Sequence, residues 1–199
     1  MGKISTGFSM SLDGYVAGPN DEVDRVFQWM GQGDKDYVTT IGGQQFTLKM
    51  SDESIKMRDE QMQMIGVLVA GRHLFDISGA WGGRHPMNVP IVVLTHHPPQ
   101  EWVDKEGSPF TFVTDGFESA LTAAQKIAGE KYVALASPPL VQQAMNLGLL
   151  DEIHVDLVHV VLGKGKPLFA NLNIEPTNLK LTRLIQAPGV THMTFDVVK

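Results

Sequence analysis

The feature that most constrains this chain is a series of short, continuous apolar runs. They cover residues 66–70, 89–95, 110–113 and 132–136. Strands that are buried on both faces of a parallel sheet have this uninterrupted apolar composition. Helical patterns follow three of the runs, at residues 71–76, 119–128 and 139–147. This alternation of strand and helix predicts an α/β fold with helices on the faces of a parallel sheet.

The N-terminal part adds further elements. Residues 4–10 are a predicted strand, and residues 51–64 a predicted helix with Ser51 as its N-cap. Residues 21–30 are amphipathic enough for a short helix. Residues 31–43 are rich in glycine and charge, so we expect a loop or flap there.

The last third has a different pattern. Residues 151–162 alternate apolar and polar side chains, as a long, half-exposed strand would. Two more strands are predicted at residues 179–185 and 192–198, around a turn at Pro188–Gly189. The sheet is therefore expected to be mixed, mostly parallel, with an antiparallel C-terminal end. The length of 199 residues favours a single domain over residues 1–199.

Composition excludes several classes of protein. The formal net charge is −6 and no cluster of Lys and Arg occurs, which argues against a nucleic-acid binder. The chain has no cysteine, so disulfides, thiolate zinc sites and a cysteine nucleophile are excluded. No signal peptide or apolar stretch long enough for a membrane span is recognisable. We therefore expect a soluble cytoplasmic protein without a membrane partner.

Polar or glycine residues follow three of the predicted strands. They are Gly71-Arg72, Thr95-His96 and Ala136-Ser137. Ligands of parallel α/β sheets bind beyond the carboxyl ends of the strands, and a helix N-terminus there favours phosphate. These turns therefore predict a site for a phosphate-bearing dinucleotide. Each alone has an ordinary structural explanation, as a common turn or a solvated arginine.

Other polar and aromatic residues are weaker candidates. Asp13 ends the first strand and is a possible catalytic or substrate-contacting group, although an Asp before Gly also shapes turns. Trp81, in a glycine-rich loop, and Phe27 can stack on a flat substrate or pin their segments to the core. The histidines show no metal-ligand spacing, and no G-x-S-x-G sequence occurs, so neither a metal site nor a serine-nucleophile elbow is predicted.

Three segments in the same order carry a family resemblance. Residues 68–73 (LVAGRH) resemble the strand, turn and helix of dihydrofolate reductases. Residues 11–18 (SLDGYVAG) resemble the first strand and loop of the reductase domain of bacterial riboflavin biosynthesis. Residues 148–155 and 161–169 are similar to the C-terminal part of that family. The chain is thus identified as a member of the dihydrofolate reductase-like superfamily, of the riboflavin deaminase-reductase C-terminal type.

The resemblance implies a three-layer α-β-α fold, an NADPH site, hydride transfer and a homodimer that buries part of the C-terminal sheet. Residues that match the turn holding the pyrophosphate are Gly71, Arg72, His73 and Leu74. Thr95 and His96 match the pair beside the 2′-phosphate, and Val16 and Ala17 the loop beside the nicotinamide. The second phosphate-binding turn corresponds to Ala136, Ser137, Pro138 and Leu140.

This second turn departs from the family pattern. It is usually glycine-rich, whereas this chain has Pro138-Pro139, and proline has no N–H to donate. Ser137 is expected to cap the following helix instead. Leu74 stands where dihydrofolate reductases often carry a hydroxyl residue, and no carboxylate matches their pterin-binding position near Met30.

The predicted function is an NADPH-dependent oxidoreductase that transfers a hydride to a small heterocyclic substrate of the pterin or pyrimidine type. Asp13 or water would supply the proton. The alternatives are a non-catalytic nucleotide-binding module on the same fold, which the proline turn motivates, and an assembly protein built on the strand at residues 151–162.

Overall fold

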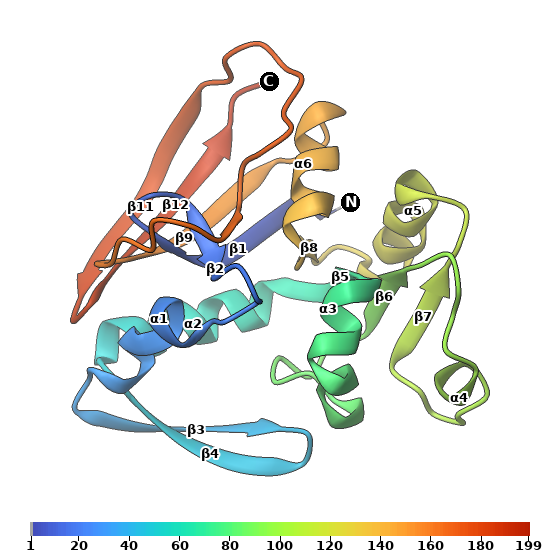
Figure 1. Ribbon diagram of the computed structural model, residues 1–199, viewed down its shortest axis with the longest axis horizontal. Coiled ribbons are helices and arrows are strands. Elements are labelled where there is room, and N and C mark those ends of the chain that lie inside the picture. Colours follow the sequence, from blue (N-terminus) through green and yellow to red (C-terminus); the bar gives the residue numbers. More distant parts are fainter. Residues whose placement is uncertain (1) are drawn as a thin grey trace.

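The architecture centres on one eight-stranded sheet. A computed structural model describes residues 2–199, and its main sheet has the strand order β11-β12-β9-β1-β8-β5-β6-β7 (Figure 1). Six neighbouring strands are parallel: β1 (Ile4–Ser11), β5 (Ile65–Gly71), β6 (Ile91–Leu94), β7 (Phe110–Val113), β8 (Tyr132–Leu135) and β9 (Glu152–Val158). The antiparallel end is formed by β11 (Leu179–Ala187) and β12 (Val190–Val197). The predicted mixed, mostly parallel sheet is confirmed.

Helices cover both faces of this sheet, which confirms the three-layer arrangement (Figure 1). On one face, α5 (Phe117–Ala128) and α6 (Pro138–Asn146) pack against the odd-numbered valines of β5. On the other face, Phe75 of α3 (Arg72–Ile77) packs against Leu68 and Ala70. Further along that face, α2 (Asp52–Met64) and the 3-10 turn η1 (Gln28–Gly31) lie over β9 and β12. The short α1 (Asp24–Phe27) contacts β1 and β2. The short α4 (Gln100–Val103) precedes β7.

The predicted loop at residues 31–43 is wrong. β3 (Lys35–Ile41) and β4 (Gln44–Met50) form an antiparallel hairpin. Its two-residue turn is Gly42-Gly43, with φ of 57° and 81°, and positive φ at both positions is what such a hairpin turn requires. The glycines and charges indicated a loop, but they belong to the turn and the exposed faces of the hairpin. The predicted helix at 21–30 is also shorter, because only Asp24–Phe27 is α-helical.

The hairpin reaches across the molecule. At its tip, a Cβ added at Gly42 would lie 3.5 Å from Cα of Gly82, in the 3-10 turn η2 (Gly79–Gly83) that follows α3. That contact is ordinary, but a Cβ added at Gly82 would lie only 2.5 Å from Cα of Gly42, so this close approach needs glycine at position 82. The contact closes a ring of elements from α2 through the hairpin to the end of α3.

The strand predicted as half-exposed is interior. β9 lies between β1 and β12, and its polar residues Glu152 and His154 are buried. They satisfy each other, because His154 Nε2 lies 2.7 Å from Glu152 Oε1. Lys3 Nζ contacts the second oxygen of Glu152 at 2.5 Å. The alternation therefore reflects two covered faces of β9: one is apolar, and on the other the polar side chains pair with one another.

A second buried network fixes α2 on the sheet. His192 of β12 is almost fully buried, with Nδ1 2.6 Å from Asp156 Oδ1 and Nε2 2.9 Å from Ser54 Oγ. The Trp29 ring meets the edge of His192 at a centroid distance of 5.1 Å, and its indole N–H donates to Ser9 Oγ. Buried polar groups need such partners, so this network ties the first turn of α2 to β12 and β9.

We predict that His192→Ala lowers the free energy of unfolding by about 3 kcal/mol, because it removes a buried imidazole that packs on Trp29 and bonds both Asp156 and Ser54. Urea unfolding at neutral pH measures this. The control is His159→Ala, which removes an exposed histidine next to the same strand and is expected to change stability by less than about 0.5 kcal/mol. Equal effects of the two substitutions would contradict the assignment.

Candidate functional site

The carboxyl ends of β5 and β8 bring two of the predicted turns together. The N–H of Gly71 donates to Ser137 Oγ at 2.9 Å. Ser137 does not cap α6 through its side chain, contrary to the expectation, because its hydroxyl is directed at Gly71. Helix α3 begins at Arg72 and α6 begins at Pro138. Two helix N-termini therefore flank one hydrogen bond at the edge of the sheet.

The two helix starts offer an anion very different surroundings. Pro138 and Pro139 have no N–H, and the N–H groups of Leu140 and Val141 both donate to the carbonyl of Ser137, at 3.0 and 3.2 Å. At α3, no helical turn precedes the first N–H groups, so these groups have no acceptor within the helix and can donate to an anion. The Leu140 side chain is buried in the main core, so it does not reach a ligand.

Arg72 and the end of β6 form one side of this edge. Arg72 Nε lies 2.7 Å from Asp76 Oδ1, and its Nη1 donates to the carbonyl of His97. Thr95 is buried, and its Oγ1 accepts the N–H of His97 at 3.2 Å. His96 is exposed next to it. The structure thus brings Arg72 and the 95–97 turn together, as the strand-end argument predicted.

His73 and Leu74 point in different directions. The exposed His73 places Nε2 2.9 Å from Oδ2 of Asp21, in the turn after β2 (Tyr15–Ala17). Lys166 of β10 (Lys166–Pro167), the partner strand of β2, lies 3.7 Å from the other oxygen of Asp21. Leu74, also in α3, instead turns toward the sheet and packs against the core. The Asp21 carboxylate therefore joins the β2 turn to the start of α3.

Val16 and Ala17 are buried in β2, and Asp13 anchors the turn before it. The Asp13 carboxylate accepts the N–H groups of Leu162 at 3.0 Å and Gly163 at 2.7 Å. Hydrogen bonds from the Ser11 hydroxyl and from these two N–H groups lower the pKa of Asp13 to about 2. At neutral pH this carboxyl is ionised, so it has no proton to donate.

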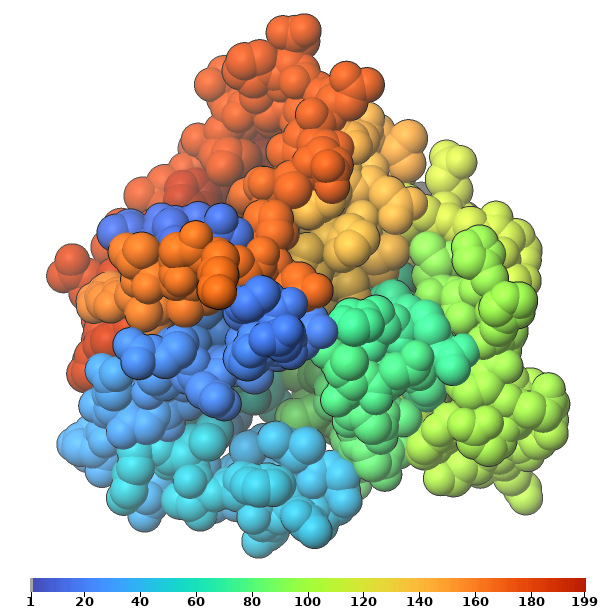
Figure 2. Space-filling model, in the orientation of Figure 1, coloured from blue at the N-terminus to red at the C-terminus, as the bar shows by residue number. Residues whose placement is uncertain are grey.

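A hollow lies below these turns. Figure 2 shows it between the blue segment around α1, helix α3 and the cyan hairpin. The two aromatic candidates belong to elements around it. Phe27 is exposed at the end of α1, and Trp81 of η2 is half-buried against the core under α3. Ala80 and Trp81 have φ of 52° and 50°, a left-handed conformation that is uncommon for such residues and often marks functional sites.

Side chains that the sequence reasoning missed also surround this region. His85 meets Trp81 edge-on at a centroid distance of 5.0 Å. Arg58 of α2 lies over the ring of Tyr37 in β3, with 5.7 Å between guanidinium carbon and ring centroid. Burial, and then the charge of Arg58, lower the pKa of His85 to about 4. No local pattern joins these residues, which come from a hairpin, a helix and a loop.

Within residues 2–199, no group of three or more His, Asp or Glu side chains could hold a metal ion. Over the same residues, no helix is long and apolar enough to cross a membrane.

The pKa of His85 predicts a pH dependence of stability. Between pH 6.5 and about 4, the unfolded chain binds a proton that the folded chain does not, so the free energy of unfolding falls as the pH falls. We expect His85 to contribute about 2 kcal/mol to this loss between pH 7 and 4.5. Urea unfolding at both pH values measures it. His85→Asn should flatten the slope and exposed His97→Asn should not; identical slopes in all three proteins would refute the assignment.

Comparisons with known proteins agree with this geometry. The model of the RibD C-terminal domain family matches residues 3–193. The chain is 24% identical to the protein YyaP of Bacillus subtilis over 208 aligned positions, covering 97% of this chain and 94% of YyaP. A protein from Shewanella sp. PV-4 assigned to riboflavin biosynthesis superimposes with a TM-score of 0.74, 20% identity and full coverage of both chains.

Dihydrofolate reductase from Enterococcus faecalis, in complex with NADP(H) and RAB-propyl, shares the fold. Its TM-score is 0.56 with 15% identity, over 99% of this chain and 97% of that enzyme. The predicted superfamily is therefore confirmed: this chain belongs to the RibD C-terminal domain family and has a dihydrofolate reductase-like fold.

Proposed function

We propose that this protein is an NADPH-dependent reductase of a small heterocyclic substrate of the pterin or pyrimidine type. The observation that carries the proposal is the junction of the Gly71 and Ser137 turns at the carboxyl ends of β5 and β8, with Arg72 beside it. Membership of a family of riboflavin-type reductase domains supports it. We place the enzyme in the cytoplasm.

The residues at this junction fit a dinucleotide, but the turn before α6 lacks the N–H donors of a usual phosphate-binding turn. The N–H groups of the first turn of α3 would hold one phosphate, while α6 contributes no free N–H. Arg72 and exposed His96 would face the adenosine end, and Val16 and Ala17 the nicotinamide. Gly71 leaves space here, because a Cβ added to it would meet only Ser137 within 4 Å.

Chemistry divides between cofactor and protein. Bound NADPH supplies the hydride, and the protein positions the substrate and excludes water. Asp13, ionised at neutral pH, positions the β2 segment through the 162–163 turn instead of donating the proton. Water therefore delivers the proton in this proposal. Trp81 of η2 and exposed Phe27 of α1 would provide aromatic surface for a flat substrate.

The competing function is a nucleotide-binding module without catalysis. Two observations favour it: α6 begins with prolines, and Asp13 carries no proton at neutral pH. Both functions predict nucleotide binding, and turnover separates them.

We predict that NADPH binds and quenches or shifts tryptophan fluorescence, and that Arg72→Gln weakens its affinity about tenfold by removing a charged donor. The matched control is Arg25→Gln, an exposed arginine on α1. Oxidation of NADPH with one member of a panel of pterins, pyrimidines and quinones would rule out the non-catalytic module. No binding at millimolar NADPH would overturn the reductase.

A homodimer through the antiparallel end is the second part of the proposal. β11 is an edge strand, and Leu179, Leu181 and Leu184 lie on one face of it, opposite Val197, Phe195 and Met193 of β12. The bulge between Leu181 and Arg183 keeps the three leucines on that face, and each is 43–52% exposed. A second copy offers the same strip, so a two-fold contact would cover both.

Sedimentation tests the dimer. We expect the protein to sediment as a dimer at micromolar concentration, and the double substitution Leu181→Lys with Leu184→Lys to make it a monomer by placing charge in the contact. Lys180→Glu, on the opposite face of the same strand, should leave the dimer intact. A wild-type protein that is monomeric under these conditions would overturn this part of the proposal.

A further inference from the structure

The start of α3 already holds an anion that the protein itself supplies. His73 Nε2 lies 2.9 Å from Oδ2 of Asp21, whose carboxylate comes from the 18–22 turn between β2 and α1. An ionised carboxylate only accepts hydrogen bonds, so the imidazole donates here. A phosphate oxygen is an acceptor of the same kind and needs the same N–H. In the free protein, Asp21 therefore occupies the position on His73 that a phosphate would take.

The 18–22 turn holds Asp21 in this position. The Gly18 N–H donates to the carbonyl of Glu22 at 2.7 Å, and the Asp21 N–H donates to the carbonyl of Gly18 at 3.2 Å. The Glu22 carboxylate accepts both the backbone and the side-chain N–H of Asn20, each at 2.8 Å. Asp21 has φ of 66°, a left-handed conformation that Asp and Asn adopt more readily than other non-glycine residues. The turn is thus closed on itself, and the Asp21 carboxylate is directed out of it toward α3.

Asp21 has a second partner on its other side. Lys166 Nζ of β10 lies 3.7 Å from Asp21 Oδ1, and β10 pairs with β2, the strand before the turn. The Asp21 side chain is 25% exposed and that of His73 is 68% exposed. An exposed ion pair contributes little stability, so the contact with His73 can break at small cost. Lys166 still balances the carboxylate when it does.

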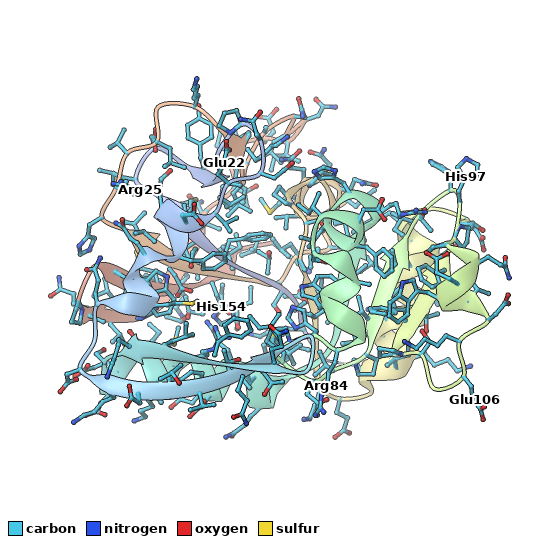
Figure 3. The ribbon with its side chains drawn as sticks, turned by 60° about the horizontal axis from the view of Figure 1, so that its bottom comes forward. Glu22, Arg25, Arg84, His97, Glu106 and His154 are labelled. Atoms are coloured by element: carbon cyan, nitrogen blue, oxygen red, sulfur yellow. The ribbon has the colours of Figure 1, made fainter. Side chains whose placement is uncertain are left out.

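The contact spans the path of the proposed cofactor. The turn begins directly after Ala17, which we place beside the nicotinamide, and reaches His73 of the pyrophosphate turn. Figure 1 shows the chain after β2 running toward the upper end of α3, and in Figure 2 the blue and teal surfaces meet there. In Figure 3, Glu22 and His97 lie to either side of α3. A phosphate and the Asp21 carboxylate repel and compete for one N–H, so His73 cannot hold both.

We propose that the contact between Asp21 and His73 is an autoinhibitory latch that must open before NADPH binds. The inference concerns the regulation of the cofactor site and rests on the proposed function for the identity of the cofactor. In the closed state the Asp21 carboxylate occupies His73. In the open state a phosphate replaces it, and the carboxylate stays with Lys166. The population of the closed state lowers the apparent affinity for NADPH, and its opening limits the rate of entry.

Fluorescence titration and stopped-flow mixing with NADPH test the latch. Asp21→Asn keeps the size of the side chain and its tolerance of positive φ, but it removes the charge. We expect this variant to bind NADPH about fivefold more tightly, the effect of losing one exposed ion pair in the free protein. Its association rate should rise and its dissociation rate should stay unchanged. Asp24→Asn, which alters an exposed acid in the first turn of α1, is the matched control and should behave as wild type.

Two results with Asp21→Asn would overturn the latch. Weaker binding with faster dissociation would mean that the contact closes over bound cofactor instead of opposing its entry. Equal affinity in the variant and in wild type would mean that the contact does not compete with the cofactor at all.

A double substitution separates the latch from simple charge repulsion. His73→Gln removes the partner that Asp21 occupies, so adding Asp21→Asn to it should change the NADPH affinity by less than about twofold. A full gain of about fivefold in the His73→Gln background would show that Asp21 acts only as a distant negative charge, and the proposal would fall.

Inorganic pyrophosphate distinguishes failure of the latch from failure of the reductase. Calorimetry should show that Asp21→Asn binds pyrophosphate more tightly than wild type does. If neither protein binds NADPH but the variant gains affinity for pyrophosphate, the reductase proposal fails and a latch on an anion site stands. If both proteins bind NADPH and pyrophosphate equally well, the reductase stands and the latch fails. If neither protein binds either ligand, both proposals fail.

Discussion

The burial of polar side chains on β9 and β12 is the constraint on which much of this structure depends. His192 lies inside the protein, where an unpaired donor is expensive, and its partners are the half-buried Asp156 of β9 and Ser54 in the first turn of α2. That bond fixes the position of α2 on the sheet. Arg58 is four residues beyond Ser54, one helical turn along the same side, so the network also helps to place the guanidinium.

The sequence was sufficient for the parts of the fold that local patterns determine. Continuous apolar runs located β5, β6, β7 and β8 to within a few residues, and Ser51 was correctly predicted as the N-cap of α2. The hairpin was missed because glycine and charge outweighed the alternation around Gly42-Gly43. β9 was misread as half-exposed because partners for Glu152 and His154 come from distant strands and no local pattern reveals them.

The candidate site was predictable only where it follows from topology. The carboxyl ends of parallel strands meet at one edge, so the sequence alone places Gly71, Thr95 and Ser137 in one group. The direction of the Ser137 hydroxyl, toward Gly71 and not toward its own helix, depends on how close two separate turns approach. Arg58, Tyr37 and His85 meet through a hairpin that bridges the molecule, and sequence spacing carries no information on such a meeting.

The charge of Arg58 also acts on a titratable neighbour. Arg58 contributes to the low pKa of His85, because a nearby cation disfavours a second positive charge. Burial is the larger of the two causes, because desolvation disfavours the charged imidazolium. Both causes act only in the folded protein, so protonation of His85 on acidification favours the unfolded chain.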